Sequence, residues 1–394
     1  MFYKETDFKE EPFIGEIPKD WDVAKLGDKS ISEIIMGQSP PSSTYNKDGV
    51  GLPFLQGKIE FGDIYPKVLV YCSKPIKIAE PNDVLFSVRA PVGDVNLAPY
   101  KLCIGRGLAA IRFNNERVSH SFYFYWFQKI KKHLEALGKG STFKAVNKDD
   151  LENLRVPLPP LNEQRGIVGV LGVVDSVIAK TGEVIAKTER LKKGLMQTLL
   201  TRGIGHKEYK QTPIGKIPED WETVKLEELL NLRNGQRPKI SETGHFPIFG
   251  ANGIMGYTDE FLTENDFTLI FGRVGASGEM HLGEGKIWVS DNAIFSQSYN
   301  KNRVYPPYLF YLLKFKNLSQ FALKTTHPII TKTFLDNFSI QLPRRLEEQK
   351  KIASILTAMD EKLQLEHIEK TRLERIKRGL MDLLLTGKIR VKVD

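Results

Sequence analysis

The chain of 394 residues contains a long internal repeat, which constrains its fold more than any other feature. Four segments of the first half return in the same order in the second half. The segments and their second copies are IGEIPKDWDVAKL (14–26) and IGKIPEDWETVKL (214–226), GQSP (37–40) and GQRP (235–238), LENLRVPLPPLNEQ (151–164) and LDNFSIQLPRRLEEQ (335–349), and ERLKKGLMQTLLT (189–201) and ERIKRGLMDLLLT (374–386). Because long repeats indicate repeated structural units, we expect two similar domains in one chain.

The distance between the copies is 200 residues at the first segment and 185 at the last. Length changes are therefore confined to the sequence between the repeated segments, which indicates a rigid frame with variable surface loops. A weaker match aligns SVRAPVGDV (87–95) with GRVGASGEM (272–280) and places Arg89 opposite Arg273.

The frame includes two predicted long helices. Apolar residues recur at alternating steps of four and three over 167–199 and, with a polar break at Glu366, over 352–384, which places an apolar strip on one face of each helix. Each helix, of about 40 residues, is ~60 Å long at 1.5 Å per residue. A lone helix would expose its strip, so we expect the two helices to pair as an antiparallel coiled coil. Four glycines of the first helix either allow close approach of the partner or are merely tolerated: Gly166, Gly169, Gly172 and Gly182.

The sequence between the frame segments indicates a mixed α/β (α+β) fold class. VLFSVRAPVGDV (84–95), LAAIRF (108–113), FTLIFGRV (267–274) and KIWVSDNAIF (286–295) have strand composition. Residues 120–137 and 306–323 predict one helix per domain. Both helices are rich in aromatic residues, whose helical spacing favours core packing over a base-stacking surface.

The composition of the chain limits the classes of function that it can have. The formal charge of +9 fits either ordinary solubility or a polyanionic partner. No apolar run approaches the ~20 residues of a membrane-spanning helix, and the N-terminus has no signal-peptide pattern, so we expect a cytoplasmic protein. The two cysteines, Cys72 and Cys103, and the scattered histidines have no metal-binding spacing, so we expect neither a metal site nor a disulfide framework.

Three near matches to enzyme motifs fail in their context. GRGLAA (105–110) fits a dinucleotide-binding pattern but leads into a strand. GKGST (138–142) lacks the first glycine of a phosphate-binding loop, and YPPY (305–308) has tyrosine where amino-methyltransferases need an acceptor for the target amine. We therefore expect a chain with no active site and no cofactor of its own.

The doubled order of these segments resembles the specificity subunit of type I restriction-modification enzymes. The resemblance rests on Trp21 and Trp221 in the entry segments, the two G-Q-x-P elements, and the LP…EQ segments that lead into helices ending in GLM…LLT. It covers nearly the whole chain.

The resemblance implies a non-catalytic subunit that reads a bipartite site in double-stranded DNA. It implies target recognition domains at 1–160 and 204–344, and spacer helices at 161–203 and 345–388. These helices dock two DNA-methyltransferase subunits, on which S-adenosylmethionine is expected, and motor-nuclease subunits complete the restricting complex.

Candidate DNA contacts are residues of the types that bind phosphate, guanine or adenine, in equivalent loops of both halves. The G-Q-x-P element is either such a contact or a structural turn, and any single arginine is as readily a structural ion pair. The candidates are Gln38, Ser39, Arg89, Lys139, Ser141, Thr142, Lys144, Lys148, Gln236, Arg237, Lys239, Arg273, Lys324, Thr325, Thr326, His327 and Lys332. A stand-alone two-headed DNA-binding regulator is the alternative function, and a methyltransferase in its own right is a third.

Overall fold

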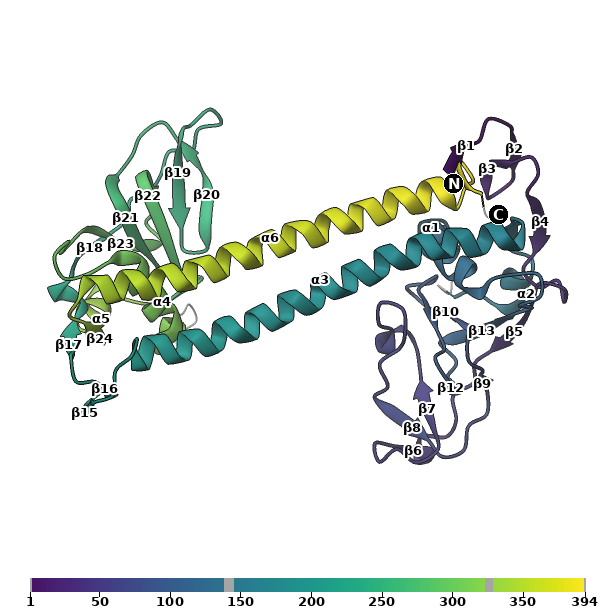
Figure 1. Cartoon of the computed structure of the whole chain (residues 1–394), viewed down its shortest axis with the longest axis horizontal. Coiled ribbons are helices and arrows are strands. Elements are labelled where there is room, and N and C mark those ends of the chain that lie inside the picture. Colours follow the sequence, from purple (N-terminus) through teal and green to yellow (C-terminus); the bar gives the residue numbers. More distant parts are fainter. Residues whose placement is uncertain (1, 138–144, 323–328, 393–394) are drawn as a thin grey trace. The chain divides into compact units, whose positions relative to one another are not determined.

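The computed structural model describes residues 2–137, 145–322 and 329–392. By its internal contacts the chain divides into two compact units: unit 1 comprises residues 1–181 and 369–394, and unit 2 comprises residues 182–368. Each unit is mixed α/β and includes part of both long helices, α3 (Leu161–Arg202) and α6 (Leu346–Leu384) (Figure 1). The predicted fold class is confirmed.

Unit 1 contains a four-stranded sheet of order β11-β10-β13-β5 and a five-stranded sheet of order β6-β8-β7-β12-β9. Helix α1 (His120–Leu137) packs on β10 and β11 and buries residues 122–127, so its aromatic side chains lie in the core as predicted. A short helix α2 (Lys148–Glu152) follows. The strands are β1 (Phe2–Lys4), β2 (Phe8–Glu11), β3 (Gly15–Pro18), β4 (Asp22–Lys25), β5 (Ser32–Met36), β6 (Tyr45–Asn46), β7 (Leu52–Leu55), β8 (Val70–Cys72), β9 (Ile78–Ala79), β10 (Val84–Ser87), β11 (Val95–Leu97), β12 (Leu102–Ile104), β13 (Leu108–Phe113), β14 (Arg155–Leu158) and β25 (Ile389–Val391).

Unit 2 contains a six-stranded sheet of order β18-β23-β21-β22-β19-β20, against which helix α4 (Pro306–Lys316) packs. A short helix α5 (Lys332–Asp336) precedes the strand that leads to α6. The strands are β15 (Tyr209–Thr212), β16 (Gly215–Pro218), β17 (Trp221–Lys225), β18 (Leu230–Asn234), β19 (Phe246–Gly250), β20 (Gly253–Thr258), β21 (Thr263–Gly272), β22 (Met280–Val289), β23 (Ala293–Tyr299) and β24 (Ser339–Pro343).

Two predicted elements of unit 2 differ from the structure. The helix predicted over 306–323 ends at Lys316, because Asn317 adopts a left-handed conformation (φ 48°) and a 3-10 turn follows. The strand predicted over 286–295 is two strands, β22 and β23, joined by a turn at 290–292. Within the described residues, no helix combines the length and apolar character that crossing a membrane requires.

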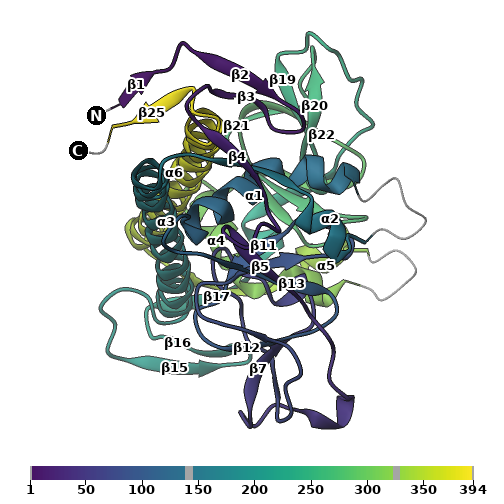
Figure 2. The same ribbon diagram turned by 90° about the vertical axis from the view of Figure 1, so that its right-hand side faces the viewer.

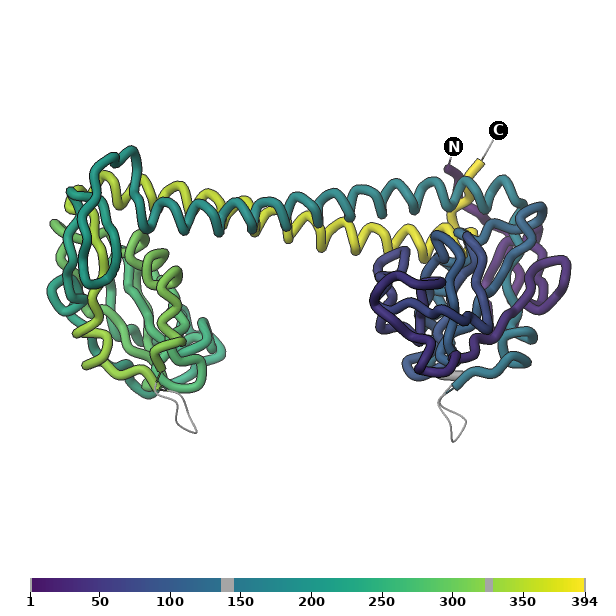
Figure 3. Tube along the Cα trace, turned by 90° about the horizontal axis from the view of Figure 1, so that it is seen from below, coloured from purple at the N-terminus to yellow at the C-terminus, as the bar shows by residue number. Residues whose placement is uncertain are grey.

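The two long helices pack together, and the start of one helix packs beside the end of the other (Figures 1 and 3). In unit 1 the core includes Ile167 and Leu171 of α3 together with Met381 and Leu384 of α6. In unit 2 the core includes residues 199 and 200 of α3 with residues 352 and 356 of α6. The predicted antiparallel pair is therefore confirmed.

A polar triad sits where the helices pair in unit 1. The Tyr125 hydroxyl of α1 donates to Asp175 of α3 (2.7 Å), and Lys377 of α6 pairs with the same carboxylate (2.7 Å). The Lys377 ammonium also lies 5.3 Å from the centroid of the Tyr125 ring. One carboxylate thus joins the domain helix to both long helices.

Unit 2 contains the same triad. The Tyr311 hydroxyl of α4 donates to Asp360 of α6 (2.8 Å), and Lys192 of α3 pairs with that carboxylate. The two aspartates and the two lysines are each 185 residues apart, which is the spacing of the last repeated segment.

Two of these glycines of α3, Gly169 and Gly172, do not serve close helix packing. A side chain built on Gly169 or Gly172 would meet no heavy atom within 4 Å. Of the two explanations offered by the sequence, tolerance at an open surface holds at these two positions.

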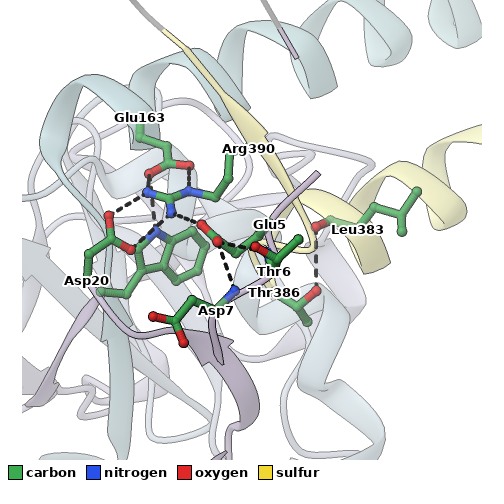
Figure 4. Close-up of polar contacts among 9 residues, drawn as sticks. Glu5, Thr6, Asp7, Asp20, Glu163, Leu383, Thr386 and Arg390 are labelled. Atoms are coloured by element: carbon green, nitrogen blue, oxygen red, sulfur yellow. Dashed lines mark hydrogen bonds and ion pairs between the residues drawn. The ribbon is translucent and has the colours of Figure 1, made fainter. Parts of the chain in front are cut away.

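Trp21 of the first repeated segment is fully buried and donates its indole N–H to Glu163 at the start of α3 (3.1 Å). Arg390 of β25 makes a bidentate contact with the same carboxylate (2.6 and 2.8 Å) and also bonds to Asp20 and Glu5 (Figure 4). Burial opposes the charge of Arg390, but the carboxylates of Glu163 and Asp20 raise its pKa above the ordinary value.

The equivalent anchor in unit 2 uses histidine in place of arginine. Trp221 donates to Glu348 at the start of α6 (3.3 Å), and His206 Nε2 lies 2.8 Å from the same carboxylate. His206 and Arg390 each stand three residues after a glycine of positive φ, Gly203 and Gly387, that follows a long helix.

The two ends of the chain meet in unit 1. Strands β1 and β25 pair antiparallel, with Phe2 opposite Val391 (Figures 1 and 2). In unit 2 the chain runs without interruption from α3 through residues 203–208 into β15. At the equivalent place, unit 1 therefore uses two segments from the two ends of the chain, and unit 2 uses one continuous segment.

The Arg390 anchor yields a stability prediction. Arg390→Ala leaves the buried Glu163 carboxylate without its main cation, and we expect a loss of ~3–5 kcal/mol in the free energy of unfolding of unit 1. Chemical denaturation followed by circular dichroism measures it. The control Arg372→Ala removes an exposed arginine paired with Glu369 and should cost less than ~1 kcal/mol. Equal losses for the two variants would contradict the structural role of Arg390.

Candidate nucleic-acid interface

The G-Q element of unit 1 directly follows β5 and lies against the turn between β12 and β13. Gly37 N–H donates to Leu108 O (2.8 Å), and Gln38 N–H donates to Ile104 O (3.0 Å). A Cβ on Gly37 would come within 2.1 Å of Gly105 O, so a larger residue does not fit.

Unit 2 repeats this geometry after β18. Gly235 N–H donates to Ala293 O (2.9 Å), and Gln236 N–H donates to Val289 O (2.9 Å) across the turn that joins β22 and β23. A Cβ on Gly235 would come within 2.1 Å of Ser290 O. The backbone of the element is therefore structural, and this explains why the glycine is repeated.

The side chains of the element, in contrast, face outward. Gln38, Gln236, Arg237 and Lys239 are exposed. Ser39 is half-buried, and its hydroxyl accepts a hydrogen bond from the Arg106 N–H (3.2 Å). The two explanations offered by the sequence thus apply to different parts of the same element: the backbone forms the turn, and the side chains are free for contact.

Arg89 and Arg273 are not equivalent, which corrects the sequence alignment by one residue. Arg273 N–H donates to Asn292 O (2.9 Å), and the corresponding bond in unit 1 runs from Val88 N–H to Gly107 O (3.0 Å). Arg89 instead corresponds to Val274. The sequence alignment paired the two arginines because both segments contain one. In an extended chain, a shift of one residue turns a side chain to the opposite face.

The two arginines also differ in environment. Arg89 is exposed, on a segment that bridges to Ala145. Arg273 is half-buried, and its Nη1 donates to Asp291 O (3.4 Å). The structure therefore brings Gln236, Arg273 and the turn at 290–292 together in unit 2.

Part of the sequence after α1 and after α4 lies outside the described residues. The candidates Lys139, Ser141, Thr142, Lys144, Lys324, Thr325, Thr326 and His327 lie in the undescribed stretches 138–144 and 323–328. Lys148 and Lys332 are described, and each is the first residue of a short helix. Each pairs with a carboxylate four residues on, Glu152 (3.3 Å) or Asp336 (2.6 Å), so part of its charge is balanced.

Sequence reasoning missed Arg106 and Trp288. Arg106 is an exposed residue of the turn that holds Gly37, and Trp288 donates its indole N–H to Gln236 O (2.9 Å). Arg106 belongs to GRGLAA, which the sequence analysis tested only as a dinucleotide motif. The signal available was its place in a short turn between two apolar strands.

In the described part of the chain, no three His, Cys, Asp or Glu side chains are grouped as metal ligands. Cys72 and Cys103 are free and buried, and burial raises the pKa of the Cys103 thiol to about 11. That thiol is protonated near neutral pH and is a poor nucleophile.

Comparisons with known proteins confirm the resemblance. The family model described as "Type I restriction modification DNA specificity domain" matches residues 18–190 and 218–375. The chain is 31% identical to the type I restriction enzyme MjaVIII specificity subunit of Methanocaldococcus jannaschii over 100% of this chain and 98% of that protein. It is 54% identical to the putative MjaX specificity subunit of the same organism, a match that spans 48% of this chain and 44% of the relative.

Solved structures agree in fold. The S subunit of a type I restriction-modification system from M. genitalium superposes with a TM-score of 0.65 at 18% identity, covering 98% of this chain and 99% of that one. A chain from a structure on complex assembly and conformational transition of the type I restriction-modification system gives a TM-score of 0.57 at 20% identity, covering 94% and 99%. This chain belongs to the family of type I restriction-modification specificity subunits, which supply the DNA sequence specificity of those systems.

Proposed function

We propose that each unit reads one half of a bipartite site in double-stranded DNA. The observation that carries this proposal is the pair of equivalent surfaces at the G-Q elements, where one backbone frame presents exposed polar and basic side chains in both units. The sequence around the frame differs between the units, so the two half-sites differ in sequence. The formal charge of +9 favours a polyanionic ligand.

In this proposal residues 1–160 and 204–344 are the two target recognition domains. Residues 161–203 and 345–388 are the spacer helices, which set the number of unread base pairs between the half-sites. The candidate contacts in 138–144 and 323–328 are part of the proposal and lie outside the described residues. The residues that border these stretches, Ala145 and Ile329, bridge to Arg89 and Val274.

The long helices also have exposed apolar residues, which suggests docking sites for partner proteins. Leu191 in unit 2 is 56% exposed and Ile376 in unit 1 is 43% exposed, and they occupy the same position of the last repeated segment. Two equivalent sites fit two copies of one partner. We take this partner to be the DNA-methyltransferase subunit, which binds S-adenosylmethionine, with motor-nuclease subunits joining the complex in the cytoplasm.

Purification and methylome sequencing test the proposal as a whole. The tagged chain should copurify with a methyltransferase, and deletion of its gene should abolish methylation at one bipartite motif. Tight binding to a DNA site by the chain alone, with no methylation lost, would instead support a stand-alone regulator. Binding of labelled S-adenosylmethionine by the chain alone would support a methyltransferase.

Two arginine variants test whether each unit reads its own half-site independently of the other unit. Arg89→Ala should weaken recognition of one half-site and Arg273→Ala that of the other, by ~1–3 kcal/mol where the guanidinium contacts guanine. Binding of the complex to duplexes mutated in either half measures the effect. Each variant is the control for the other, and equal effects on both half-sites would contradict separate readers.

A second pair of variants tests docking. Leu191→Glu and Ile376→Glu place a charge on an apolar contact without disturbing the core, and each should reduce the methyltransferase bound per chain from two copies to one. Native mass spectrometry measures the stoichiometry. Ile59→Glu, at an aliphatic residue that is 82% exposed and lies outside the two long helices, should leave two copies bound. Unchanged stoichiometry in both helix variants would reject this docking surface.

A further inference from the structure

The turns that hold the two G-Q elements are equivalent structures. In unit 1 the turn comprises residues 105–107 between β12 and β13, and in unit 2 it comprises residues 290–292 between β22 and β23. Gly105 N–H donates to Leu55 O (2.8 Å), as Ser290 N–H donates to Phe249 O (2.8 Å). Each turn is therefore tied to the neighbouring strand by the same bond.

Further bonds fix the turn in both units. Leu108 N–H donates to Gly105 O (3.0 Å), and Ala293 N–H donates to Ser290 O (3.0 Å). The two bonds from the G-Q element also match, and so does the bond from Val88 in unit 1 or Arg273 in unit 2. In total, five backbone hydrogen bonds of the turn are the same in both units. A turn held this way positions its tip residue within a narrow range, as base reading requires.

The tip residues differ sharply between the units. Arg106 stands at the tip in unit 1, and Asp291 stands at the same position in unit 2. Both are exposed, although the residues that flank Arg106 are buried. In the described part of the chain, neither the Arg106 guanidinium nor the Asp291 carboxylate has a hydrogen bond or an ion pair, so no structural contact there explains either charge.

The chemistry of these side chains points to bases. An arginine donates two hydrogen bonds to O6 and N7 of guanine, and an aspartate accepts one from the N4 amino group of cytosine. A carboxylate cannot serve as a phosphate contact, because both groups are anionic. An exposed aspartate on a DNA-facing turn therefore contributes selectivity rather than affinity.

We infer that the turn tip is a base-reading position in each unit, with Arg106 selecting guanine and Asp291 selecting cytosine through its amino group. This inference rests on the proposed reading of a bipartite DNA site. It adds two specificity-determining residues, and it predicts that exchanging the tip side chain changes the base read while the frame stays intact.

The test uses the specificity chain copurified with its methyltransferase. The probes are duplexes that contain the bipartite site found by methylome sequencing, with each recognised position randomised in turn. Arg106→Ala should reduce the preference for guanine at one position of one half-site by about 5- to 150-fold. Arg106→Gln should shift that position toward adenine, and Asp291→Ala should relax one position of the other half-site.

Matched control variants distinguish the loss of a base contact from the mere loss of a charge. Lys101→Ala and Asp266→Ala remove exposed charges of the same sign in the same units, each now held in an ion pair, and should leave every base preference unchanged. Circular dichroism and methyltransferase copurification establish that each variant is folded. If folded Arg106 and Asp291 variants keep all base preferences of the wild type, the inference is wrong, although bipartite reading stands. If the wild-type complex reads no bipartite site, the proposed function itself fails.

Discussion

The anchor between a buried tryptophan and the first turn of a long helix holds each unit together. Glu163 accepts from Trp21, and Glu348 accepts from Trp221. These carboxylates are nearly buried, so each needs donors from more than one direction. Arg390 supplies further donors to Glu163, and His206 and the Ile204 N–H supply them to Glu348. The entry segment, the helix start and the segment that follows the other helix therefore meet at one group. This explains why W and EQ are repeated although they are more than a hundred residues apart in sequence.

The glutamine of each EQ pair completes the junction. Gln164 accepts from Ser119 N–H just before α1 and donates to Pro159 O (both 2.8 Å). Gln349 accepts from Tyr305 N–H just before α4 and donates to Pro343 O (both 2.8 Å). A buried amide that uses both its acceptor and its donor is costly to replace. The domain helix, the last strand and the long helix are thereby fixed to one another in each unit.

Sequence periodicity was sufficient to predict the long helices and α1, because apolar spacing indicates which helix face is buried. It did not predict that Leu191 and Ile376, which continue the apolar spacing, are exposed. Periodicity was insufficient where backbone hydrogen bonds determine the register of a strand or the end of a helix. The register that makes Val88, and not Arg89, equivalent to Arg273 is visible only in the bonds to Gly107 and Asn292. The early end of α4 depends on the left-handed conformation of Asn317, and asparagine is only one of several residues that permit it. The anchors were missed because a Trp–Glu contact across 142 or 127 residues leaves no local pattern.

The polar triads explain how an apolar helix pair acquires a single register. A seam of apolar residues at steps of three and four presents similar surfaces after a shift of one heptad, so packing alone discriminates weakly between registers. Directional contacts discriminate strongly, because a shifted helix would leave a carboxylate without its lysine and its tyrosine hydroxyl. Asp175 meets Lys377 in unit 1, and Asp360 meets Lys192 in unit 2. Since the tyrosines of these triads belong to α1 and α4, the contact that fixes the register also fixes the domain helix of each unit to the long helices.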